Sequence, residues 1–112
     1  SSQLAAFAQG TSHFLTSEED GRTYRVTLEA DGKLSSVVFN ERGGTSVVTD
    51  VDGNVFIAGD QVFIYDRNGK PVGVLEIPER PGSLAFGDAD RRTLFIAART
   101  SLYSIRTKTA GR

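Results

Sequence analysis

A chain of 112 residues is long enough for one small domain and too short for two. Its composition, with 38% hydrophobic and 24% charged residues, is typical of a folded globular protein, and a formal net charge of −1 gives no electrostatic reason to expect nucleic acid or an anionic membrane as a partner. The absence of cysteine excludes disulfides and thiolate metal sites but leaves the compartment open. We therefore expect a soluble protein of unassigned location.

Along the chain, short β-rich runs of period two alternate with polar turns, and no helical periodicity extends over ten residues. Asp-Gly and Asn-Gly turns at 31–32, 52–53 and 68–69 predict hairpins, because both residue types accept a positive φ at low cost. The predicted strands cover residues 3–7, 13–17, 22–28, 34–39, 45–49, 54–58, 61–66, 72–77, 83–87, 93–97 and 101–106.

The strands form a repeat. The run Val55–Ala58 is echoed by Leu94–Ala97 after 39 residues, and an aspartate-rich turn precedes each run. Four strands in about 40 residues are typical of a β-propeller blade. A β-sandwich also uses short strands at this density, but it does not require one strand quartet to echo the next. The sequence therefore predicts an all-β fold of three propeller blades, at about 1–41, 42–79 and 80–112. Between the blades, the repeat predicts buried side chains at Phe7, Val48, Phe56, Phe86, Phe95 and Tyr103.

Residues 44–106 resemble the C-terminal part of the gluconolactonase and regucalcin-like (senescence marker protein) family of six-bladed propellers. The segments that carry the resemblance are Asp52-Gly53-Asn54, Pro78-Glu79-Arg80-Pro81, Leu84–Gly87 and Ala98–Tyr103. The resemblance implies a lactone hydrolase with one divalent cation, calcium or zinc, at the mouth of the central channel. In this family a Glu, an Asn and an Asp hold the cation.

The family's metal ligands do not recur in this sequence. The resemblance places Thr45 at the Asp position and Gln3 at the Asn position, while the Glu belongs to a blade outside this chain. Neutral oxygens alone hold a hard dication weakly, so we expect no metal or other cofactor bound by this chain alone. Residues expected near the channel mouth, where a small lactone or sugar-like ligand would bind, are Gln3, Thr45, Ser46, Arg80 and Arg99.

Other chemical candidates have simpler interpretations. His13, the single histidine, has no catalytic partner fixed by spacing. The aspartates of the turns, such as Asp50, lack the calcium-loop spacing and are expected to accept hydrogen bonds from their own backbone. Gly43-Gly44 lacks the lysine and the helix of a phosphate loop, which favours a tight approach to an inner strand.

Two classes of function stay open, and no catalytic residue is assigned. The first is a catalytic or ligand-binding propeller, and the second is a non-catalytic structural or assembly segment. Three blades leave sheet edges and faces without neighbours, whereas closed propellers have at least four blades. We therefore expect further blades from another copy or another chain as partners.

Overall fold

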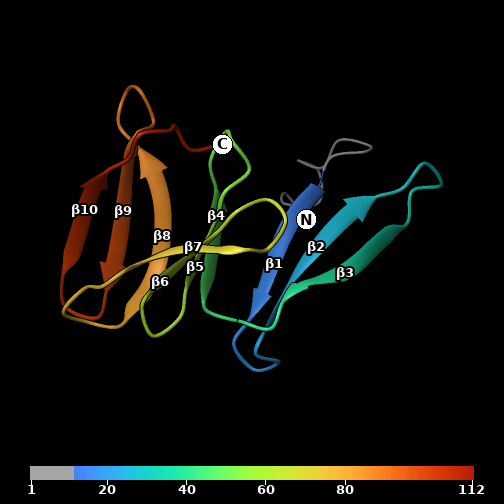
Figure 1. The fold of residues 1–112 in the computed structure, drawn as a ribbon, viewed down its shortest axis with the longest axis horizontal. Helices are drawn as coiled ribbons and strands as arrows, with labels where there is room; N and C mark the ends of the chain where they lie inside the picture. The colour runs from blue at the N-terminus through green and yellow to red at the C-terminus, as the bar shows by residue number, and fades with distance from the viewer. Residues whose placement is uncertain (1–11) are drawn as a thin grey trace.

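In the computed structural model, residues 12–112 are described, and they form ten β-strands without a helix (Figure 1). That part of the chain therefore holds no helix long and apolar enough to cross a membrane. The predicted strand 3–7 lies outside the described residues. The strands are β1 (Ser12–Ser17), β2 (Arg22–Leu28), β3 (Leu34–Asn40), β4 (Ser46–Thr49), β5 (Val55–Ala58), β6 (Val62–Tyr65), β7 (Pro71–Leu75), β8 (Pro81–Gly87), β9 (Thr93–Ala98) and β10 (Leu102–Arg106).

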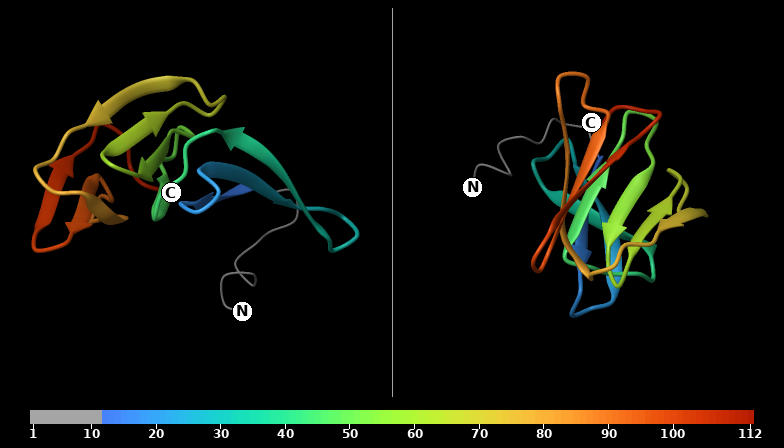
Figure 2. Two further views of the ribbon diagram at one scale, coloured as in Figure 1. Left: turned by 90° about the horizontal axis from the view of Figure 1, so that it is seen from below. Right: turned by 90° about the vertical axis from the view of Figure 1, so that its left-hand side faces the viewer.

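The strands pair into three consecutive antiparallel sheets, in the orders β1-β2-β3, β4-β5-β6-β7 and β8-β9-β10. Each pairing joins strands that are adjacent in sequence, as in a blade, and Figure 2 shows the sheets following one another along an arc. The predicted all-β architecture is confirmed. The middle sheet has all four strands, whereas the last sheet has no counterpart of β7 among the described residues.

Local turn chemistry sets the hairpins. In the turn between β6 and β7, the Asp66 carboxylate accepts the backbone N–H groups of Asn68 and Lys70 at 2.9 and 3.0 Å. Gly69 in the same turn has a φ of 86°, a conformation that side chains with a Cβ rarely adopt. The turn between β4 and β5 repeats the arrangement with Asp50 and Gly53. The aspartate-rich turns are thus self-bonded, as the sequence predicts.

The core lies on both faces of the middle sheet. Because successive side chains of a strand point to opposite faces, Phe56 and Ala58 pack toward the last sheet while Val55 and Ile57 pack toward the first. All four residues of β5 are buried, so this strand lies at the centre of the arc. The side toward the last sheet also buries Val62, Leu84, Leu94 and Ile96.

The predictions of buried residues are confirmed in part. Phe56 is 6% exposed, and Val48, Phe86 and Tyr103 are half-buried against the same cluster. For Phe95, which was also expected between adjacent blades, the described residues provide no test, because no described sheet follows the last one. Leu94 and Ile96 face the core, which turns Phe95 to the opposite face of the last sheet, where it is half-buried. No sheet among the described residues covers that face. Phe7 lies outside the described residues.

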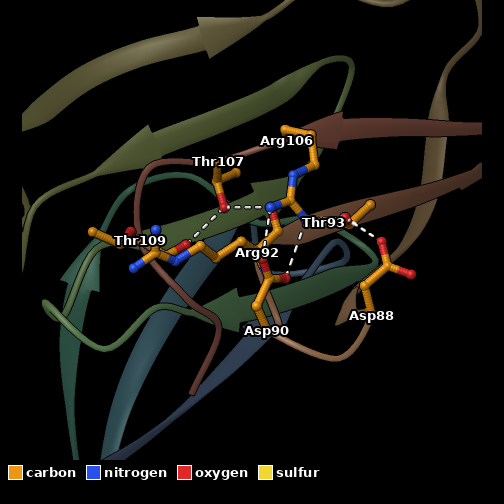
Figure 3. A network of polar contacts seen from close by, with 7 residues as sticks. All are labelled: Asp88, Asp90, Arg92, Thr93, Arg106, Thr107 and Thr109. Atoms are coloured by element: carbon orange, nitrogen blue, oxygen red, sulfur yellow. Dashed lines mark hydrogen bonds and ion pairs between the residues drawn. The ribbon is translucent and has the colours of Figure 1, made fainter.

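The C-terminal tail, residues 107–112, returns to the middle sheet. Asp50 and Gly111 form a β-bridge, and the Thr109 hydroxyl donates to the buried Asp50 carboxylate at 2.6 Å. Figure 3 shows the start of the tail, where Arg106 donates to both oxygens of the Asp90 carboxylate. The tail therefore ties the last sheet to the middle one.

Candidate functional site

Most of the predicted site residues lie at one end of the sheets, the end at which β4 and β8 begin, here called the mouth. The turns between β1 and β2, between β5 and β6 and between β9 and β10 lie at the same end. A cavity of about 530 Å³, the mouth pocket, opens there. Its polar side chains are Glu18, Thr45, Arg80, Ser83 and Arg99. The fold thus brings Thr45, Arg80 and Arg99 to one pocket, although they come from three separate segments.

Thr45 is held in place by main-chain contacts. Its N–H donates to the Ala58 carbonyl at 2.9 Å, and its hydroxyl donates to the Gly82 carbonyl at 2.6 Å. The approach of the chain to Thr45 requires glycine, because a Cβ on Gly44 would lie 2.1 Å from the Ala58 carbonyl oxygen. A Cβ on Gly43 would lie 1.9 Å from a main-chain oxygen of β1. The Gly-Gly pair is therefore a point of close main-chain approach, as the sequence indicates.

Ser46 lies beside the mouth pocket and does not line it. Its Oγ accepts the N–H of Leu84 at 3.1 Å and so joins the inner strands β4 and β8 of neighbouring sheets. This contact gives Ser46 a structural role in spacing the two strands. Gln3 lies outside the described residues.

The two arginines of the mouth pocket differ in their surroundings. Arg80 forms ion pairs with Glu18, at 2.8 Å, and with Asp60, so it links the turns of the first and middle sheets. The hydrogen bond to Glu18, followed by the charge of Asp60, raises the pKa of the Arg80 guanidinium above its usual value. Arg99, in contrast, has no hydrogen bond or ion pair to any residue between 12 and 112.

Glu79 positions the turn that carries Arg99. Its carboxylate accepts the Thr100 hydroxyl at 2.6 Å, the Thr100 N–H at 3.1 Å and the Tyr103 hydroxyl at 2.9 Å. These hydrogen bonds, the Thr100 hydroxyl foremost, lower the pKa of Glu79 to about 2. Sequence reasoning assigned Glu79 no role, although it stands in the Pro-Glu-Arg-Pro segment that carries the resemblance.

A match to a family model identifies the family of this chain. The model of the SMP-30/Gluconolactonase/LRE-like region matches residues 24–100, which is more than half of the chain. The chain belongs to this family. A search of curated proteins gave no significant match.

Two solved structures of gluconolactonase-like propellers share the fold. One is a protein described as a candidate gluconolactonase, with 23% identity and a TM-score of 0.76 over 94% of this chain. The other is regucalcin from Agrobacterium tumefaciens, described as a calcium-binding protein, with 19% identity and a TM-score of 0.79 over 95% of this chain. This chain spans 38% and 45% of their respective lengths, and is therefore equivalent to a segment of the propeller.

The described part of the mouth pocket does not fit the divalent cation that the family uses. The Thr45 hydroxyl donates a hydrogen bond to the Gly82 carbonyl. The one acidic residue of the lining, Glu18, forms an ion pair with Arg80. Between residues 12 and 112, no group of three His, Cys, Asp or Glu side chains could hold a metal ion. His13 lies half-buried in β1 and does not line this pocket.

Proposed function

We propose that this chain is the segment of a gluconolactonase-like propeller whose mouth pocket binds a small lactone or sugar-like ligand once further blades complete the ring. The observation that supports this function is the convergence of Thr45, Arg80 and Arg99 on one cavity. Its volume of about 530 Å³ lies in the usual range for small-molecule sites.

The side chains of the pocket suit a ligand rich in oxygen. A guanidinium carries five N–H donors, and those of Arg99 are unused within the described residues. The ring, carbonyl and hydroxyl oxygens of a lactone or sugar are acceptors for such donors. The Thr45 hydroxyl donates a hydrogen bond to the Gly82 carbonyl, so its oxygen lone pairs can accept a hydrogen bond from a ligand hydroxyl. Arg80, engaged by two carboxylates, stabilises the wall of the pocket.

Binding can be tested by nuclear magnetic resonance titration of the protein, in the assembled state that further blades complete, with gluconolactone and with gluconate. We expect saturable shifts of the amide signals of Gly82 and Ser83, and a loss of affinity of about tenfold in Arg99→Gln, the cost of one hydrogen bond to a charged group. Lys70→Gln is the matched control, since Lys70 lies in a turn at the opposite end of the middle sheet. Equal effects of the two substitutions, or no saturable shifts with either compound, would refute ligand binding at the mouth pocket.

A second candidate function, a non-catalytic assembly segment, is supported by the uncovered parts of the sheets. The outer edge of β10 has no fourth strand within the described residues. Leu102, on the same face as Phe95, is 68% exposed, and Leu15 of the first sheet is 60% exposed. Apolar faces of this kind are typical of surfaces that another chain covers. We propose that blades from another copy or another chain cover them. An assembled species in sedimentation velocity, together with no ligand binding in the titration above, would favour this second function.

A further inference from the structure

A second pocket, the tail-side pocket, lies at the end of the sheets opposite the mouth. Its volume is about 420 Å³. Phe14 and Arg25 of the first sheet form one wall, and residues 51–53 and Arg67 in the turns of the middle sheet form another. Arg112 of the C-terminal tail completes the lining. Three arginines therefore face one pocket that has a single acidic residue, Asp52, in a chain whose net charge is −1.

Two of these arginines are held in position by neutral groups. Arg25 Nη2 donates to the main-chain carbonyl of Arg67 at 2.5 Å, and Arg67 Nη2 donates to the carbonyl of Asp52 at 2.9 Å. All ion pairs found among residues 12–112 involve other arginines, namely Arg22, Arg80 and Arg106. A carbonyl fixes a guanidinium but leaves its full charge, and each guanidinium retains most of its five donors. The side chains that line the pocket therefore carry more positive than negative charge.

Two aromatic rings lie next to Arg25. The Arg25 guanidinium lies 5.4 Å from the ring centroids of both Phe14 and Phe39, within the range of a cation–π contact. Arg25 is half-buried, and a charge shielded from water attracts an anion more strongly than an exposed one. Because Phe14 also lines the pocket, an apolar surface stands next to the charged groups.

We infer that the tail-side pocket binds a small organic anion, with its phosphate or carboxylate group on Arg25 and Arg67 and its apolar part against Phe14. The planar guanidinium matches both groups, since each offers two oxygens for paired hydrogen bonds. The volume leaves room for a ligand body beyond the anionic group. This site lies at the other end of the sheets from the mouth pocket, so the two can be tested separately.

Titration of the protein with phenyl phosphate and, separately, with benzoate tests the inference and distinguishes the two anionic groups. We expect at least one probe to shift the amide signals of Val51 and Gly53 saturably. Arg67→Gln, which replaces an exposed side chain, should weaken that binding about tenfold. Arg25→Gln should weaken it as much, provided that its spectrum shows a folded chain.

Arg22→Gln is the matched control, because Arg22 lies in the same strand as Arg25 but is paired with Glu41 at the mouth. Its affinity for the probe should stay within about twofold of the unmodified protein, since exposed charges far from a ligand are screened by salt. The inference is overturned if neither probe shifts the pocket signals at millimolar concentration, or if Arg22→Gln weakens binding as much as Arg67→Gln.

Discussion

Replacing Phe56 by alanine removes the ring at the centre of the interface between the middle and last sheets. The side chain is 6% exposed and packs edge-to-face on Phe86, with a centroid distance of 5.5 Å. A phenylalanine ring that buries roughly 150 Å² contributes about 4 kcal/mol at about 25 cal/mol per Å². Large-to-small substitutions at such sites cost about 3–5 kcal/mol. We therefore expect Phe56→Ala to lower the free energy of unfolding by that amount.

Urea denaturation followed by far-ultraviolet circular dichroism measures this loss. Val72→Ala is the matched control, since Val72 lies in the same sheet, in β7, but is 56% exposed. Its loss should be about 0.5 kcal/mol or less, as for other surface substitutions. A loss below about 1 kcal/mol for Phe56→Ala, or a larger loss at Val72 than at Phe56, would show that the assignment of faces is wrong.

Three further outcomes follow from the local contacts. Gly44→Ala should destabilise the fold by about 2 kcal/mol or more, since its Cβ would meet the Ala58 carbonyl oxygen at 2.1 Å; an unchanged urea midpoint would contradict this. Thr109→Val should cost about 1–3 kcal/mol in the same assay, because it removes a hydrogen bond from the buried Asp50 carboxylate, whereas Lys108→Gln, at the exposed neighbouring position, serves as the control and should leave the midpoint unchanged. The pKa of Glu79 is about 2 in the folded protein against a usual 4.5, so its stabilising contribution is complete above pH 4.5 and should be lost as the pH falls toward 2. A Glu79→Gln variant should show a weaker decline of the urea midpoint over that range, and an identical decline would refute the assignment.

Burial alone would raise the pKa of Asp50, but hydrogen bonds from Thr109 and Asn54 outweigh it and hold the pKa below its usual value. Asp50 is therefore ionised and anchors both its own turn and the C-terminal tail. The two anchoring roles of Asp50 could not both be predicted from the sequence. The spacing of Asp50 and Gly53 indicates a turn, but Thr109 lies 59 residues away with no pattern to connect it.

The repeat predicted the strands well because each blade reuses the same alternation and turn residues. It could not predict how far Phe95 is buried. Phe56 and Phe95 occupy equivalent positions, yet burial depends on the neighbouring sheet, and the described residues supply one for Phe56 alone. A local pattern indicates the face on which a side chain lies, whereas the fold determines what covers it.

For the candidate site, too, the sequence predicted which residues lie near the mouth but not the contacts between them. Thr45 and Arg99 were predicted near the mouth from the resemblance, and the fold places both in one pocket. The ion pair of Arg80 with Glu18 was not predicted, because it joins residues 62 positions apart. The tail-side pocket could not be predicted from the sequence either, since Arg25 and Arg67 meet only when the first two sheets pack together.

We propose that this chain is a propeller segment whose sheets are completed by further blades. Sedimentation velocity at micromolar concentration tests it most directly, because the method measures the mass of the assembly in solution. We predict a species well above the 12.1 kDa of one chain, either as a complex of copies or after addition of the chain that carries the other blades. A monomer of 12.1 kDa that unfolds cooperatively in urea would contradict the claim.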